Sequence, residues 1–318
     1  MEVINLSRVS EITINTFEEF QQKICNMNTS RFEYQSFVYR GQAKDWELLP
    51  KAHRIEEKKK IEEYSDYKKD TSEIFYISAE DNLLFEFYNL SKRNGLRVPT
   101  VPQYDFRHSV SIDTEDFIRA GVKEWYPKNL VELAALAQHN GVPTRLIDWS
   151  FDVNSAIYFA ALKAIELALA NGNKYVSDYI VIWVFDLNNF DLFKSVNNPD
   201  DIPFNFIVPN YYNNTNLNAQ SGILSYWECK DLSRAKEIVI EPFDTRIEKF
   251  NNKDRGTEFL EEILKKVKIP AKESVKIAKY LYNAGYSAAK MFPGYNGVIK
   301  AIEEKKMIIK ASMLLCNL

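Results

Sequence analysis

Two short polar segments, far apart in the chain, contain residue types from which a ligand site could be built. In the first, Tyr39, Arg40 and Gly41 end the β-branched and aromatic stretch "QSFVYR", so a permanent positive charge stands at the end of an expected strand. An arginine presents a planar fork of donors that matches phosphate and carboxylate groups. Glycine lets other groups approach the backbone closely. We therefore expect Arg40 to contact an anionic ligand, and Gly41 to keep that approach open.

The second segment is "QHNGVPTRLIDWS", residues 138–150, between two apolar helical stretches. Its polar side chains must either reach the surface or find partners inside the protein. A purely structural explanation is available, in which each residue caps a helix, supplies a turn or forms an ion pair. In that explanation His139 caps the preceding helix, Gly141 supplies a positive φ, Arg145 or Arg40 pairs with Asp148, and Ser150 or Asp152 caps the next helix. Caps need only a few of these residues, so the whole cluster favours a binding site.

Composition limits the classes of protein. The chain has 318 residues, a net charge of −3, and three widely spaced cysteines without metal-ligand spacing. These features predict a reduced, cytoplasmic protein. They also predict no overall positive potential that would attract nucleic acid. The N-terminus lacks the pattern of a signal peptide, and the longest apolar stretch is interrupted by Lys163 and Glu166, so we expect no membrane contact.

Two other enzymatic chemistries find less support. His53, His139, Asp148 and Asp152 could supply metal ligands, but they form no paired-ligand motif, so we predict no metal. A serine nucleophile would need a Gly-x-Ser-x-Gly nucleophile elbow, and a reactive cysteine would need positively charged neighbours. The sequence shows neither.

The elements that must position both segments can be outlined from periodicity and turn signals. Thr16 and Glu19 predict a capping box before a helix over residues 17–27. Further helices are expected over residues 78–95, 129–141, 151–172, 272–285 and 296–307, and strands over 35–40, 178–187, 204–209, 223–227 and 237–243. Residues 54–70 are rich in charges of both signs and predict a solvated helix or insertion. The order favours an α+β fold.

Taken together, these motifs resemble the FRG domain family. "VYRGQ" with the following Trp46, Leu48, Pro50 and Arg54 matches the family's first motif, and residues 138–150 match its second. "AQSG", with Gln220 and Gly222, and "LYNAGYSAAKMFPGY" are similar to its later segments.

The family's motifs are in turn similar to those of ADP-ribosyltransferases. This resemblance implies a mixed central β core of ADP-ribosyltransferase type surrounded by helices, and NAD as cosubstrate. It implies catalytic roles for Arg40, His139 and Gln220, with Glu228 and Glu258 in reserve for Gln220. The residues implied to bind NAD are Tyr39, Arg40, Gly41, Gln42, Thr144, Arg145, Asp148, Trp149 and Ser150, with Trp149 or Tyr39 as the stacking face.

The resemblance also implies an organisation and a role. We expect an N-terminal helical extension over residues 1–30, a catalytic domain over 31–300 with a charged helical insertion near 54–95, and a C-terminal tail over 301–318. The expected function is ADP-ribosyl transfer to RNA, DNA or protein by a toxin or antiphage effector, with a neutralising antitoxin as partner. The alternative is a non-catalytic nucleotide-binding or sensor module that uses the same arginine pocket.

Overall fold

One mixed sheet organises the protein. The computed structural model describes residues 10–29, 36–64, 73–107, 125–196, 204–209, 219–229, 240–251 and 263–315. Within these ranges the sheet has the strand order β1-β7-β4-β2-β3-β6-β5. The strands are β1 (Ser10–Thr13), β2 (Phe37–Gln42), β3 (Ile147–Ser150), β4 (Tyr179–Asp186), β5 (Phe204–Ile207), β6 (Gly222–Trp227) and β7 (Leu264–Pro270). The β1–β7 pair is parallel and the other pairs are antiparallel. The strand that carries Arg40 is thus central.

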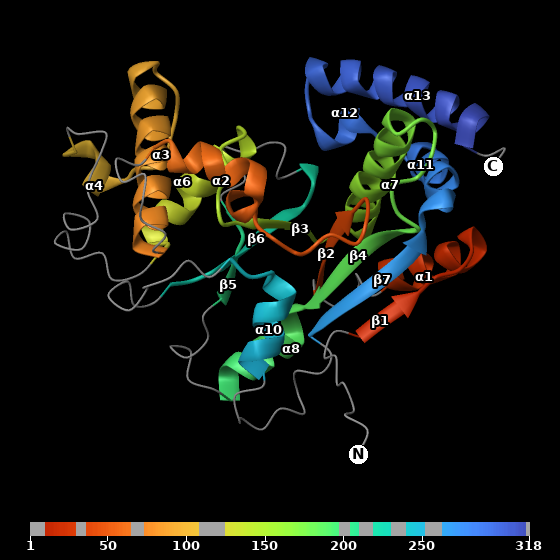
Figure 1. The fold of residues 1–318 in the computed structure, drawn as a ribbon, viewed down its shortest axis with the longest axis horizontal. Helices are drawn as coiled ribbons and strands as arrows, with labels where there is room; N and C mark the ends of the chain where they lie inside the picture. The colour runs from red at the N-terminus through yellow and green to blue at the C-terminus, as the bar shows by residue number, and fades with distance from the viewer. Residues whose placement is uncertain are drawn as a thin grey trace.

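Helix α7 (Val153–Ala170) packs against the centre of this sheet (Figure 1). Its length and its mean hydropathy of 1.4 would suit a membrane span, but 61% of it is buried inside the protein. Around it lie α1 (Phe17–Thr29), the short 3-10 turn η7 (Ala271–Glu273), α11 (Ser274–Asn283), α12 (Ala288–Met291) and α13 (Tyr295–Leu315). Ile157 and Ile182 are among the buried residues that join helix and sheet in one core cluster.

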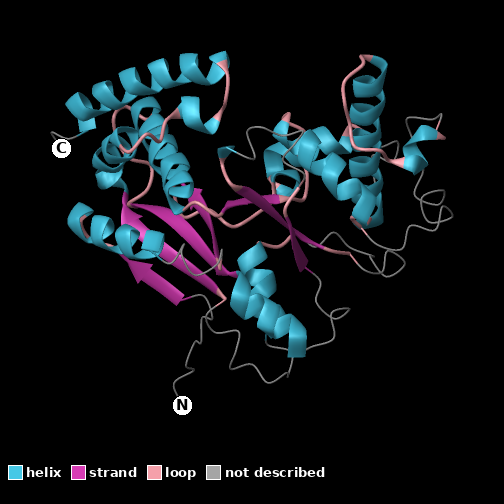
Figure 2. Ribbon diagram, turned by 180° about the vertical axis from the view of Figure 1, so that it is seen from behind, coloured by secondary structure: helices cyan, strands magenta, loops and turns pink. Residues whose placement is uncertain are grey.

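A second group of helices lies at the β3–β6 side of the molecule (Figures 1 and 2). It comprises the 3-10 turn η2 (Lys51–His53), α2 (Ile55–Glu62), α3 (Glu73–Arg93), α4 (Pro102–Asp105) and α6 (Lys128–His139). Its apolar cluster includes Leu84, Leu133 and the inward residues Leu224 and Tyr226 of β6. The predicted charged insertion therefore contains a core helix, α3.

The opposite face of the sheet is covered by α8 (Leu187–Val196) and α10 (Phe243–Asn251). Trp149, Phe185 and Phe243 belong to the apolar cluster on that side. Because successive strand residues point to opposite faces, Asp148 and Ser150 face the α6 and α7 side while Ile147 and Trp149 face α10.

The predicted α+β class, with a mixed sheet among helices, is confirmed. The Thr16 half of the capping box is also present, since Glu19 N donates to Thr16 Oγ1 (3.1 Å), while the Glu19 side chain accepts at Oε2 from Asn15 N, the residue before the cap (2.9 Å). Strands β1, β3 and β7 and helices α8 and α10 were not predicted. The strand expected over 237–243 lies largely outside the described residues, and Phe243 begins α10 instead.

The domain boundaries expected at residues 30 and 300 do not coincide with breaks in the described structure. β1 pairs with β7 inside the sheet, so the residues before 30 contribute a strand to it. Helix α13 runs through residue 300, and its Ile308, Ala311 and Leu315 are buried in a core cluster with α7 and α11.

Candidate functional site

A cavity of about 400 Å³ lies over strands β2, β3 and β6, between α6 and α7. Its volume is in the range of small-molecule sites, roughly 300–1,000 Å³. The cavity is lined by Tyr39, Arg40, Gly41, Ala135, Gln138, His139, Asp148, Trp149, Ser150, Ala156, Phe159, Gln220, Leu224 and Phe292. The two polar segments, distant in the sequence, thus line one pocket, and Gln220 lines it as well. Pairing of β2 with β3 at Tyr39 and Ser150 brings them together.

Arg40 is fixed at the seam between β2 and β3. Its Nη1 donates to the main-chain oxygen of Asp148 at 2.8 Å and lies 3.8 Å from the Asp148 carboxylate. Burial lowers the pKa of the Arg40 guanidinium. The negative charge of Asp148 raises this pKa, and the positive charge of Arg54 lowers it further. Its buried Nε has no hydrogen-bond partner. The expected structural pairing with Asp148 therefore exists, and donor capacity remains for a ligand.

Asp148 is the one acid among the lining residues, and its side chain is 60% exposed. Gln138 Nε2 donates to its Oδ1 at 2.7 Å, and Gln138 Oε1 accepts from the Thr144 hydroxyl. Thr144 itself is buried and does not line the cavity, so it orients Gln138 instead of contacting a ligand. Gln138 belongs to the second polar segment, but its residue type alone does not distinguish a ligand contact from a helix-end hydrogen bond.

His139 ends α6 at the exposed rim of the cavity. Partial burial lowers its pKa, and Asp148 acts in the opposite direction. The imidazole is therefore neutral at pH 7 and able to accept a proton. The next glycine, Gly141, has the expected positive φ of +99°.

Gln220 precedes β6 and is held by two contacts. Its main-chain oxygen accepts from Ser150 Oγ at 2.6 Å, and its Nε2 donates to Met291 O at 3.1 Å. That orientation leaves Oε1 as the amide end available to a ligand. Ser221, the next residue, has a φ of +49°, a costly conformation for a residue other than glycine. The backbone conformation that places Gln220 at the cavity is thus energetically unfavourable.

The aromatic faces of the cavity are Tyr39, Phe159 and Phe292. Phe159 and Phe292 form an edge-to-face pair with ring centroids 6.2 Å apart. The expectation that Trp149 offers a stacking face is wrong, because its side chain is 3% exposed and packs with Phe185 and Phe243 on the other side of the sheet. Its Nε1 donates to Ser225 Oγ. Phe292 lies in the segment "LYNAGYSAAKMFPGY" and Phe159 in the apolar helix expected over residues 151–172, where an aromatic side chain indicates packing as readily as ligand contact.

Gly41 lines the cavity as expected, whereas Gln42 does not. A Cβ on Gly41 would lie 1.8 Å from the main-chain oxygen of Ala156, so this glycine lets α7 pack closely on β2. Gln42 is 6% exposed, and its Oε1 accepts from Trp183 Nε1 at 2.9 Å. Neither residue needs a ligand to explain its type.

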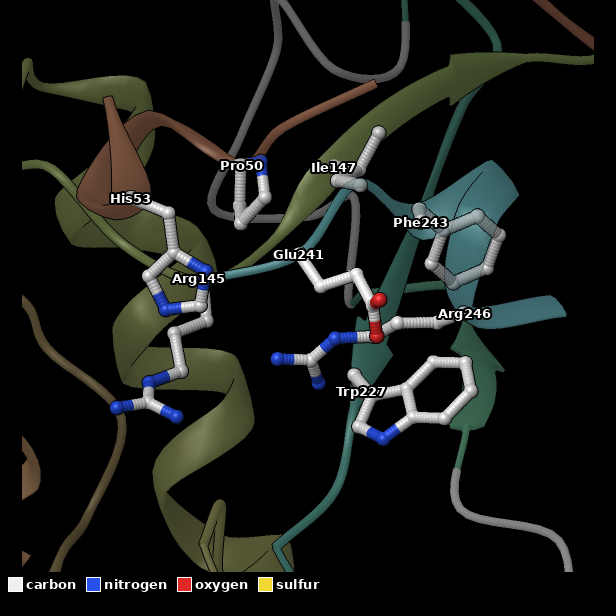
Figure 3. A pocket seen from close by; sticks show the side chains of 8 residues that line it. All are labelled: Pro50, His53, Arg145, Ile147, Trp227, Glu241, Phe243 and Arg246. Carbon is white, nitrogen blue, oxygen red and sulfur yellow. The ribbon is translucent and has the colours of Figure 1, made fainter. Parts of the chain in front are cut away.

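Arg145 does not reach the cavity and does not pair with Asp148. It is 5% exposed, and its Nη1 and Nε bind Glu73 and Glu80 of α3. Burial raises the pKa of Glu80 to about 7 despite this contact. Two carboxylates share one buried guanidinium, so the second is harder to ionise. Arg145 joins α3 to β3 and lines a different, smaller hollow (Figure 3).

The four residues considered as metal ligands are dispersed. His53 lines the smaller hollow, His139 and Asp148 line the cavity, and Asp152 caps α7 by accepting from Asn154 N at 3.1 Å. Within the described residues no group of three or more such side chains could hold a metal ion.

The reserve acids are not at the cavity either. Glu228 accepts from Asn205 Nδ2 at 2.6 Å and does not line it, and Glu258 lies outside the described residues.

Comparison with known families supports the sequence resemblance. The model of the FRG domain family matches residues 35–167, which includes both polar segments and α7. Over these residues the chain is therefore similar to the FRG domain family. No curated protein and no solved structure matches the chain.

Proposed function

We propose that the cavity binds NAD and that the protein transfers ADP-ribose from it to a macromolecular acceptor. The observation that carries this proposal is the shared cavity, in which Arg40, His139, Asp148 and Gln220 face one space beside aromatic side chains. NAD combines an anionic diphosphate, ribose hydroxyls and an aromatic nicotinamide, and the cavity offers a group suited to each.

In the proposed transfer, the bond between ribose C1′ and the nicotinamide nitrogen breaks, and the electron pair leaves with nicotinamide. Positive charge then develops on the ribose, where the Asp148 carboxylate and Gln220 Oε1 can stabilise it. An oxygen or nitrogen of the acceptor forms the new bond to C1′ and gives up its proton. Neutral His139 at the rim is suited to accept that proton.

Arg40 and the aromatic residues serve binding in this proposal. Arg40 contacts the diphosphate with the donors that Asp148 does not use. Phe159, Phe292 or Tyr39 supplies the stacking surface in place of Trp149. Ser150 is held by Gln220 O, so its part is to position Gln220.

The test is release of nicotinamide and labelling of an acceptor. Purified protein is incubated with NAD carrying a label on its adenylate, with and without cell lysate, and with lysate pretreated with nuclease or protease. We expect free nicotinamide, and label on a macromolecule that one of the two pretreatments removes. An absence of nicotinamide in every arm, together with no NAD binding by calorimetry, would overturn the proposal.

One observation favours a second candidate, a nucleotide-binding or sensor module. The single acid that lines the cavity, Asp148, is already engaged by Gln138 and lies near Arg40. A cavity whose one acid is held by these neighbours suits binding better than bond cleavage. Saturable NAD binding without nicotinamide release in any arm would select this candidate.

We also propose a cellular role, which rests on the resemblance of the motifs to ADP-ribosyltransferases. A cytoplasmic transferase of this kind would act as a toxin or antiphage effector restrained by an antitoxin. Induced expression should then arrest growth, and the Gln220→Ala variant should not.

A further inference from the structure

Figure 3 shows the residues that line a second, smaller hollow. Ile147 lines it, whereas its neighbour Asp148 lines the cavity on the opposite side. Three basic side chains from different elements lie around the hollow. His53 comes from η2, Arg145 from the segment before β3, and Arg246 from α10.

Two of these side chains are deeply buried with unused polar atoms. His53 is 5% exposed, and neither ring nitrogen has a hydrogen-bond partner. Arg145 is also 5% exposed, and while Nε and Nη1 bind carboxylates, its Nη2 has no partner. A buried donor without a partner costs about 1–3 kcal/mol. A ligand in the hollow could satisfy these atoms.

The electrostatic environment at His53 is positive. Burial lowers the pKa of His53 well below its usual value, and Arg145, Arg246 and Lys58 lower it further. The ring is therefore neutral, with one N–H to donate.

Three carboxylates are also near the hollow. Glu73 and Glu80 bind Arg145, and Glu241 lines the hollow near Arg246. Burial and the positive charge of Arg145 lower the pKa of Arg246. The negative charges of Glu73 and Glu241 raise it. These carboxylates offset part of the positive charge around the hollow, whereas the charged groups that act on His53 itself, Arg145, Arg246 and Lys58, are all positive.

The size of the hollow limits what can enter. Its volume of about 20 Å³ compares with the roughly 10–15 Å³ that one water requires on the same measure. About one terminal oxygen of an anion therefore fits inside the hollow, with the rest of the group at its mouth, while a whole nucleotide does not fit.

We propose that this hollow is a binding site for a phosphoryl group. His53, Arg145 Nη2 and the Arg246 guanidinium are the donors, and a tetrahedral phosphoryl group has terminal oxygens enough to accept from all three. The group is either free phosphate or the terminal phosphate of a nucleotide or RNA. Because the hollow and the main cavity lie on opposite faces of the sheet, this proposal is independent of NAD chemistry.

Arg246→Met is the informative variant. Arg246 lies over the Trp227 ring, 5.1 Å from its centroid, and methionine can keep that aromatic contact while removing the charge. Arg93→Met, on the exposed part of α3, is the matched control for loss of one charge. Circular dichroism verifies folding, and Arg246→Lys, which keeps charge without the fork, serves as a second variant.

Binding of inorganic phosphate, AMP and a short 5′-phosphorylated RNA is measured by calorimetry at constant ionic strength. For at least one of them we expect affinity to fall about 10-fold or more in Arg246→Met, as loss of a charged hydrogen bond predicts, with Arg93→Met unchanged. NAD affinity should be the same in Arg246→Met and wild type, because Arg246 does not line the main cavity, and this separates the two sites. The probe that meets these conditions identifies the source of the phosphoryl group. Equal affinity in wild type and Arg246→Met for every probe, or no binding at all, would overturn the site.

Discussion

Arg40 Nη1 donates to the main-chain oxygen of Asp148 across the seam of β2 and β3, at 2.8 Å and 108 positions apart in the chain. This contact ties the two FRG motifs together at the wall of the cavity. It also means that Arg40 contributes to folding as well as to any ligand site. The two contributions can be separated, because a lysine keeps the charge but loses the planar fork.

Arg40→Lys should weaken NAD binding about 10-fold or more, since charge-assisted hydrogen bonds contribute roughly 1.5–3 kcal/mol. Its free energy of unfolding should fall by only about 1 kcal/mol, the value of one hydrogen bond. Calorimetry and urea denaturation measure the two effects, and Arg93→Lys is the control. A variant that unfolds readily but binds NAD normally once folded would show that the role of Arg40 is structural.

Gln220→Ala should abolish ADP-ribosyl transfer while NAD affinity stays within several-fold of wild type. The amide orients the ribose, whereas Arg40 anchors the dinucleotide. Nicotinamide release and calorimetry on the same samples test this, with exposed Gln22→Ala as the control. Loss of NAD binding equal to the loss of transfer would contradict the assigned role.

Gln220→Glu should raise hydrolysis of NAD relative to transfer. A carboxylate can act as general base for water, and an amide cannot. The measured quantity is the ratio of free ADP-ribose to labelled acceptor. An unchanged ratio would mean that water is excluded or activated elsewhere in the cavity.

The sequence was sufficient to identify most of the residues around the cavity, because its motifs combined charge, glycine and amide groups that packing alone does not require. It did not indicate which side of a strand each residue occupies. The segment "LIDWS" was not recognised as strand β3, whose alternation sends Asp148 and Ser150 to the cavity and Trp149 to the opposite core.

The sequence also did not predict contacts between side chains that are far apart in the chain. Arg145 and Asp148 are close in sequence, so a local ion pair was the simplest expectation. The structure instead gives Arg145 the two carboxylates of α3, Glu73 and Glu80. They lie seven positions apart, two helical turns on one face, but only the packing of α3 beside the segment before β3 reveals the pairing.

Gly41→Ala should destabilise the protein by about 3 kcal/mol or more, at the upper end of overpacking effects. The added Cβ would meet the Ala156 main-chain oxygen at 1.8 Å, and a helix backbone cannot yield as a side chain can. Gly95→Ala is the control, since nothing lies within 4 Å there and only its φ of +71° opposes alanine. Urea denaturation compares the two. Reduced NAD binding at unchanged stability in Gly41→Ala would instead support a role in ligand approach.

Glu80→Gln should become increasingly stable relative to wild type as pH rises. Burial raises the pKa of folded Glu80 to about 7 from its ordinary 4.5, so the folded state of wild type binds a proton more tightly than the unfolded state. Wild type therefore loses stability between about pH 4.5 and 7. Glutamine does not titrate, and its Oε1 can still accept from Arg145 Nε and Trp125 Nε1, the two donors that Glu80 Oε2 binds.

The measurement is urea denaturation of both proteins at several values between pH 4.5 and 8. The difference in unfolding free energy should grow in favour of Glu80→Gln, on the order of 3 kcal/mol over the window, and level off above pH 7. His53 has a lowered pKa and makes stability rise with pH below about 6.5, the usual histidine pKa, but it is present in both proteins and cancels in the difference. The exposed Glu303→Gln on α13 controls for loss of a surface charge. A difference that stays flat with pH would mean that Arg145 keeps Glu80 ionised throughout, and that the buried cluster carries both negative charges.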